Sequence, residues 1–216
     1  HKAIRRQRQM CIRDRYIGSG DIHALLSGKN TKSHISLMQR FVSGEKPYYN
    51  AKCSPIDALR TGAILEERFL AFLPMWYFPQ YVVHCKEMDV FKASLDFAEI
   101  KEGKLNDFIE LKTVYLNDYV DNIQPIKGDN AKLLDYLKKK HKSYYNQVQE
   151  QLYCSGLNSC TLTFLCVNSY NDEENIHRKI SEDDFTKVRI SRDEQTIEYI
   201  KERGMIFQQI KDFYTK

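Results

Sequence analysis

The stretch VFKASLDFAEIKEGKLNDFIELKTV, residues 90–114, decides the fold of this chain. Its two halves, residues 90–97 and 107–114, are rich in β-branched, aromatic and alternating residues, which is typical of strands. Between them lies a polar loop that contains Gly103, a residue suited to a turn. We therefore predict a β-hairpin here, preceded by a third strand at residues 81–85.

Helical and strand patterns continue on both sides of this hairpin. Ser54 and Pro55 would begin a long helix, as its N-cap and first residue, and Gly28 would end a shorter one. The apolar run at residues 161–167 is typical of a strand buried on both faces. Helices are predicted over residues 22–28, 54–73, 130–155 and 194–214, a short strand over 188–191, and a polar, acidic loop over 171–185. Helices before, between and after strands indicate an α/β fold with a central mixed β-sheet flanked by helices.

Length and composition favour one soluble domain. The chain has 216 residues, of which 42% are hydrophobic and 29% are charged, so it can bury a continuous core. No run reaches the roughly 18 apolar residues of a membrane-spanning helix, and the basic N-terminus lacks the apolar core of a secretory signal. We expect a cytoplasmic protein without membrane contacts. Because 33 basic residues nearly balance 29 acidic ones, any contact with nucleic acid must be local.

Two features are set aside from the functional argument. Residues 1–15 have neither helical nor strand periodicity, and we treat them as a non-native or disordered segment before a single domain at residues 16–216. The cysteines are predicted to be reduced thiols, mostly buried, because a chain of this size needs no disulfide scaffold. An iron–sulfur site at Cys154, Cys160 and Cys166 is disfavoured, since their spacing fits no usual cluster pattern.

Two acids and a lysine of the hairpin form a candidate catalytic group. Side chains two apart in a strand point to the same face, so Glu110 and Lys112 project together while Leu111 faces apolar packing. If the hairpin is symmetric about Gly103, Asp96 lies opposite Glu110, about 5 Å away. Two such carboxylates repel each other unless a divalent cation binds them, and oxygen ligands are those that magnesium prefers. Lys112 would hold or deprotonate the attacking water beside the metal.

A third acid is predicted from the helix at residues 54–73. Glu66 lies four residues after Gly62 and three before Phe69, so we place it on the core-facing stripe, with Glu67 on a more polar side. A carboxylate on such a stripe needs a partner, and a metal site supplies one. Taken singly, the Glu110–Lys112 pair also fits a solvated salt bridge, and Glu66 also fits an exposed helix position; it is their conjunction that favours a nuclease.

The motifs stand in an order that resembles a known family. Gly62-x-x-x-Glu66, SLD ending at Asp96, ELK at residues 110–112 and QVQEQLY from Gln147 are similar to motifs of the lambda exonuclease and YqaJ-type viral recombinase family of PD-(D/E)xK nucleases. The resemblance runs from Ile17 to about the C-terminal helix. It implies a restriction-endonuclease-like core and a magnesium-dependent deoxyribonuclease, with Mn²⁺ as a substitute ion.

The resemblance also implies a role for each matching residue. Asp96, Glu110 and the carbonyl of Leu111 would be metal ligands, Glu66 would bind the ion directly or through water, and Lys112 would be the catalytic lysine. Gln147 would orient the lysine or the water. The family holds a 5′ phosphate with an arginine and then a serine, for which Arg13 and Ser19 are the candidates here, although Gly20 occupies the usual place of the serine. Four lysines could also follow a DNA backbone, or simply form a solvated helix face: Lys138, Lys139, Lys140 and Lys142.

The functional hypothesis is hydrolysis of DNA phosphodiesters with one or two magnesium ions. The resemblance implies a phage or prophage 5′-to-3′ double-strand DNA exonuclease that acts in recombination, in a bacterial cell or phage-infected host, as a ring-shaped homo-oligomer beside a single-strand annealing protein. Two alternatives stay open. One is an endonuclease of restriction or repair type on the same fold, and the other is a nucleic-acid-binding module whose acids are only structural.

Overall fold

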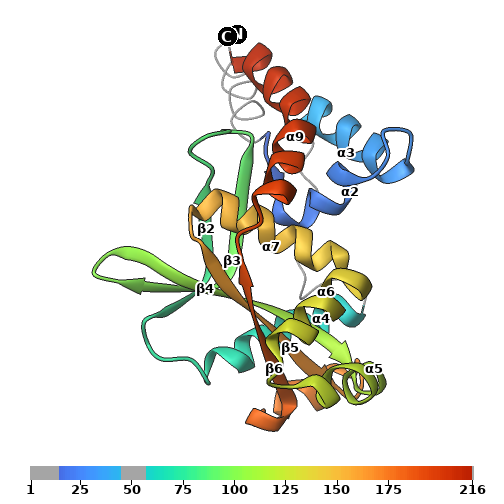
Figure 1. Cartoon of the computed structure of the whole chain (residues 1–216), viewed down its shortest axis with the longest axis vertical. Coiled ribbons are helices and arrows are strands. Elements are labelled where there is room, and N and C mark those ends of the chain that lie inside the picture. Colours follow the sequence, from blue (N-terminus) through green and yellow to red (C-terminus); the bar gives the residue numbers. More distant parts are fainter. Residues whose placement is uncertain (1–14, 45–56, 216) are drawn as a thin grey trace.

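A mixed sheet of six strands forms the centre of the protein (Figure 1). The computed structural model describes residues 15–44 and 57–215. The sheet order is β1-β3-β4-β5-β6, and β2 also pairs with β3. Pairing is parallel for β1–β3 and β4–β5 and antiparallel for β2–β3, β3–β4 and β5–β6. The strands are β1 (Ile17–Gly18), β2 (Tyr77–His84), β3 (Phe91–Lys101), β4 (Lys104–Tyr115), β5 (Ser159–Val167) and β6 (Phe185–Ser191).

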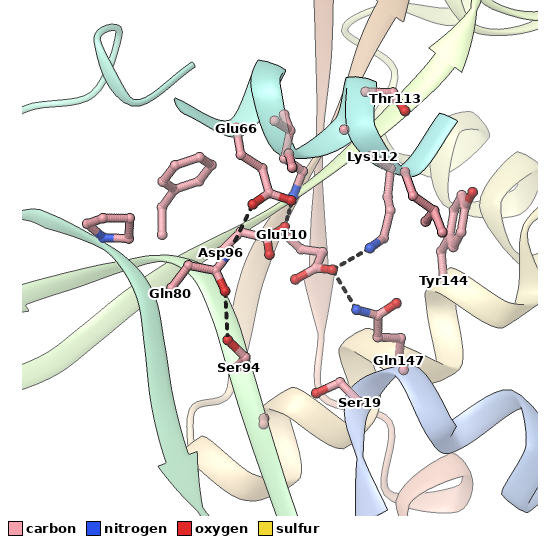
Figure 2. Close-up of a pocket in the computed structure, with 18 of the residues that line it drawn as sticks. Ser19, Glu66, Gln80, Ser94, Asp96, Glu110, Lys112, Thr113, Tyr144 and Gln147 are labelled. Carbon is pink, nitrogen blue, oxygen red and sulfur yellow. Dashed lines mark hydrogen bonds and ion pairs between the residues drawn. The ribbon is translucent and has the colours of Figure 1, made fainter. Parts of the chain in front are cut away.

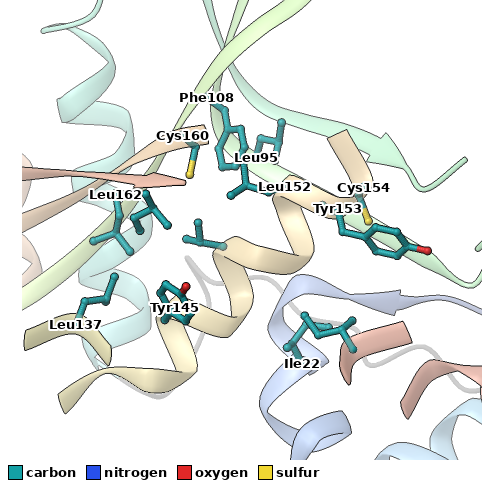
Figure 3. Close-up of a cluster of buried hydrophobic side chains, with 14 of the residues drawn as sticks. Ile22, Leu95, Phe108, Leu137, Tyr145, Leu152, Tyr153, Cys154, Cys160 and Leu162 are labelled. Atoms are coloured by element: carbon teal, nitrogen blue, oxygen red, sulfur yellow. The ribbon is translucent and has the colours of Figure 1, made fainter. Parts of the chain in front are cut away.

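Helices cover both faces of this sheet, as the α/β prediction requires (Figure 1). On one face, Phe108 and Leu162 pack with Val148 and Leu152 of α7 in the larger core (Figure 3). On the other face, Leu111 packs with Leu65 and Phe69 of α4 in a smaller core. The helices are α2 (Ile22–Leu26), α3 (Lys32–Ser43), α4 (Asp57–Leu70), α5 (Leu116–Asp118), α6 (Asn130–Lys140), α7 (Lys142–Ser155), α8 (Asp172–His177) and α9 (Glu194–Thr215).

The predicted hairpin is present, but its strand register does not follow from symmetry about Gly103 as we inferred; it depends on an irregularity in the ladder. The turn is the pair Glu102–Gly103, both with positive φ, which suits a two-residue hairpin. Lys101 pairs with Lys104, so the turn alone would not place Asp96 opposite Glu110. An irregularity at Glu99/Ile100 shifts the register, and the ladder then pairs Phe97 with Ile109. Asp96 and Glu110 are the next residues of the two strands beyond this pair.

Several predicted boundaries were wrong. The helical pattern at residues 130–155 is two helices, because the backbone leaves helical geometry at His141 (φ −126°, ψ 45°). The acidic loop at residues 171–185 contains α8, capped by the Asn171 side chain. The first helix ends at Leu26 rather than Gly28, and α4 ends at Leu70 rather than Leu73. Ser54 and Pro55 lie outside the described residues.

The domain includes one residue that we had assigned to the excluded segment. Arg15 is buried, its Nε donates to the Phe41 carbonyl at 2.9 Å, and its guanidinium lies 4.1 Å from the centre of the Tyr214 ring. The cysteine prediction is confirmed for Cys85, Cys154, Cys160 and Cys166, which are buried and unbridged. Within residues 15–44 and 57–215, no helix is both long and apolar enough to cross a membrane.

A buried acid on α7 gives the fold a pH dependence that can be measured. Burial raises the pKa of Glu150 to about 8, whereas a glutamate in an unfolded chain titrates at about 4.3. Between these values the folded protein keeps a proton that the unfolded chain has released, so stability falls as the pH rises through this window. From pH 6 to pH 8, we expect the wild type to lose about 2 kcal/mol more stability than Glu150→Gln, measured by urea unfolding. Equal losses in both proteins would contradict a neutral buried Glu150.

Candidate active site

A pocket of about 1380 Å³ lies where α4, the strands β2, β3 and β4, and the start of α7 meet (Figure 2). Its lining includes all five residues proposed from the sequence for the catalytic chemistry: Glu66, Asp96, Glu110, Lys112 and Gln147. These residues come from one helix, two strands and a second helix. The tertiary fold therefore brings the candidate catalytic residues to one cavity.

Glu110 is the centre of this group. Its side chain is fully buried, and Lys112 Nζ donates to its Oε1 at 2.5 Å. Two amides of α7 also donate to it, Gln147 Nε2 to Oε1 and Gln151 Nε2 to Oε2, each at 2.6 Å. The alternation of β4 places Glu110 and Lys112 on one face and Leu111 on the other, as predicted. The first face is the one that α7 covers, and the second is the one that α4 covers. A buried carboxylate with three donors is fixed in one orientation.

Asp96 lies beside Glu110 in an environment that disfavours its charge (Figure 2). Burial, followed by the negative charge of Glu110, raises the pKa of the Asp96 carboxyl well above its usual range. Lys112 and the Leu111 backbone N–H, which donates to Asp96 Oδ2 at 2.8 Å, oppose this shift without overcoming it. The two acids are thus close enough to repel each other, as expected for carboxylates that share a cation.

Glu66 reaches the same pocket from α4, although not from the stripe that we predicted. The core-facing residues of α4 are Thr61, Leu65 and Phe69, and Glu66 flanks them while Glu67 is exposed. Burial and the charge of Glu110 raise the pKa of the Glu66 carboxyl. Glu66 Oε2 accepts a hydrogen bond from Gln80 Nε2 at 2.9 Å. The helix acid therefore belongs to the same electrostatic group as the two strand acids.

Lys112 is held as a cation by these acids. Burial by itself lowers the pKa of Lys112, but the carboxylates of Glu110 and Asp96 outweigh burial and raise it. Its Nζ also lies 5.4 Å from the centre of the Tyr144 ring, within range of a cation–π contact. With the acids unneutralised, Lys112 is a proton donor rather than a base.

The carboxylates of the pocket are the oxygen ligands that a hard divalent cation prefers, although they do not form a complete coordination shell. Among the described residues, no three His, Cys, Asp or Glu side chains are placed to enclose an ion as they stand. The oxygens of Glu110 are occupied by Lys112 and the glutamines, and one oxygen of Glu66 is occupied by Gln80. Burial and the charge of Glu110 nevertheless raise the pKa values of the Asp96 and Glu66 carboxyls, and a cation would stabilise their charged forms.

Three residues that hydrogen-bond the acids of the site or one another were missed in the sequence: Gln151, Ser94 and Gln80. Gln151 lies four residues after Gln147, so helical spacing could have indicated that both reach the same acid. Ser94 lies two residues before Asp96 on β3, and its Oγ donates to Gln80 Oε1 at 3.2 Å. Nothing in the sequence pattern indicates Gln80. Gln149 serves the fold instead, because it bonds the backbone of Ser191 and Asp193.

The predicted DNA-binding residues fall into three groups. Ser19 is buried and lines the pocket, whereas Arg13 lies outside the described residues. Lys138, Lys139, Lys140 and Lys142 are exposed at the junction of α6 and α7 and are absent from the pocket lining. Lys139 pairs with Asp135 at 2.8 Å. Contact of these lysines with DNA stays a prediction.

Comparison with known proteins gives structural neighbours but no sequence relatives. No family model and no curated protein matches the chain. An alkaline exonuclease, LHK-Exo from Laribacter hongkongensis, superposes with a TM-score of 0.62 at 16% identity, covering 94% of this chain and 91% of the exonuclease. LHK-Exo in complex with dAMP gives 0.61 at 16% identity, with 95% and 92% covered. A phage-related exonuclease from Haemophilus somnus gives 0.57 at 16% identity, with 91% and 93% covered. These neighbours are consistent with the resemblance to the lambda exonuclease and YqaJ-type family, and this chain shares their α/β fold.

Proposed function

We propose that this protein is a magnesium-dependent DNA nuclease, and specifically a 5′-to-3′ exonuclease on double-stranded DNA of the kind that acts in phage or prophage recombination. The observation that carries the proposal is the meeting of Glu66, Asp96, Glu110 and Lys112 in one pocket, from separate parts of the chain. The fold shared with two exonucleases, one of them solved with dAMP, supports the same reading. A ring-shaped oligomer and a single-strand annealing partner rest on the family resemblance alone.

In this proposal the acids bind the cation and Lys112 orients the attacking water. Asp96, Glu110 and the Leu111 carbonyl would bind Mg²⁺ or Mn²⁺, with Glu66 binding directly or through water. The ion would polarise the phosphate and lower the pKa of a bound water. Lys112 would orient that water and balance charge that develops on the phosphate. Once the acids are neutralised, the charges that raise the pKa of Lys112 are weakened and burial, which lowers it, remains.

Gln147 and Gln151 would keep Glu110 in place during this chemistry. Both amides donate to its carboxylate from α7, and such outer partners usually fix the orientation of a metal ligand. Because Lys112 and Gln147 share Glu110 Oε1, the lysine and the acid are positioned together.

Digestion of linear and covalently closed DNA separates the candidate functions. We expect the protein to degrade linear duplex in Mg²⁺, with nucleotides released from 5′-labelled ends, and to leave closed circular duplex intact. Excess EDTA should abolish degradation and added Mn²⁺ should restore it. Nicking or linearisation of the closed circle would instead favour the endonuclease alternative. Binding of duplex without any divalent-dependent cleavage would favour the binding module and contradict the proposal.

A further inference from the structure

Gln80 has a backbone conformation that its residue type seldom adopts. Its φ is 52°, and the described residues contain one other non-glycine residue with positive φ, Glu102. Glu102 lies in the tight β3–β4 turn, where this conformation is required. Gln80 lies inside β2, and a strand does not require this conformation. A left-handed residue in a strand carries strain, and such strain occurs most often at functional sites.

The strain coincides with a break in the sheet beside the candidate catalytic acids. The β2–β3 ladder pairs Pro79 with Phe97 and Tyr81 with Leu95, while Gln80 and Asp96 between them form no ladder pair in the described register. At this break in the ladder, the Gln80 side chain lies in the pocket and faces Glu66 and Ser94 (Figure 2).

Both ends of the Gln80 amide are engaged there. Nε2 donates to Glu66 Oε2 at 2.9 Å, and Oε1 accepts from Ser94 Oγ at 3.2 Å. Because a carboxylate only accepts hydrogen bonds, the amide must turn its nitrogen to Glu66. Gln151 Nε2 in turn donates to the Ser94 carbonyl at 3.2 Å as well as to Glu110. A chain of hydrogen bonds therefore joins the acid on α4 to the acid on β4.

We infer that Gln80 is a positioning residue that holds Glu66 over the sheet as a metal ligand, and that the strained backbone is kept for this purpose. The inference rests on the proposed function, since it concerns the same ion. Glu66 flanks its helix's apolar stripe and is only partly buried, so without the amide it would be free to turn toward solvent. An uncharged donor suits this role, because a cation here would compete with the metal.

Gln80→Gly tests the inference, because glycine adopts the left-handed backbone without cost and removes only the side chain. Glu102→Gly is the matched control, with the same relief of backbone strain in a turn outside the pocket. Binding of Mn²⁺ to the DNA-free protein would be followed by electron paramagnetic resonance, and unfolding by calorimetry. We expect Gln80→Gly to bind Mn²⁺ about tenfold more weakly without a loss of melting temperature. Glu102→Gly should bind as the wild type does.

Ser94→Ala gives an independent check, because it leaves the backbone of Gln80 unchanged and frees the other end of its amide. Ser94→Ala should also weaken Mn²⁺ binding, but by a smaller factor than Gln80→Gly does. Wild-type Mn²⁺ affinity in both Gln80→Gly and Ser94→Ala, in a protein that still cleaves DNA, would overturn the inference and leave the proposed function standing. Failure of the wild type to bind Mn²⁺ at all would overturn both.

Discussion

Lys112→Ala is expected to lower the rate of DNA hydrolysis by about 10²- to 10⁴-fold, the range associated with loss of a positioned acid or base. Lys112 Nζ is bonded to Glu110. Lys92 also lines the pocket, but its Nζ lies 4.8 Å from the centre of the Tyr16 ring, so it is not placed to take over the role of Lys112. Duplex binding should change little, because one of many basic residues is lost. The measurement is the single-turnover rate on linear duplex at saturating Mg²⁺.

Lys104→Ala is the control for this experiment. Lys104 lies on the same strand, β4, but in the exposed turn outside the pocket, so its loss should leave the rate unchanged. Unfolding of Lys112→Ala should be measured beside its activity, since the buried Glu110 loses one donor and keeps two. A folded Lys112→Ala protein that cleaves at the wild-type rate would show that the lysine is only structural.

Glu110→Gln should have an effect at least as large, about 10³-fold or more on hydrolysis, because several kcal/mol of charge stabilisation are lost with a metal ligand. The substitution preserves shape and removes the charge at the centre of the group. An amide at this position also brings a donor against Gln147, Gln151 and Lys112, which all donate to residue 110. Hydrolysis and Mn²⁺ binding should therefore fail together.

Glu99→Gln provides a comparison within the same sheet. Glu99 is also buried, and it is bonded to Trp76, Lys101 and Asn106 rather than to pocket residues. Its substitution should lower stability without changing the metal dependence of cleavage. If Glu110→Gln and Glu99→Gln lost activity only in proportion to their loss of stability, the metal-ligand role of Glu110 would be refuted.

Local patterns were enough to predict most of the sheet and its central residues. The period of two along β4 put Glu110 and Lys112 on one face and Leu111 on the other. The hairpin brought Asp96 to Glu110, even though the register depends on an irregularity at Glu99/Ile100 that we did not foresee. Gln147 was found only through the resemblance of its motif, because helical periodicity does not show which acid a side chain meets.

The sequence by itself determined the α/β fold and the alternation of β4 that puts Glu110 and Lys112 on one face, because residue type and periodicity act over a few positions. The tertiary structure alone decided how these groups are held. The contacts of Gln80 with Glu66 and of Gln151 with Glu110 join residues far apart in the chain. They depend on a single left-handed torsion and on the docking of two helices, and neither leaves a repeating pattern in the sequence.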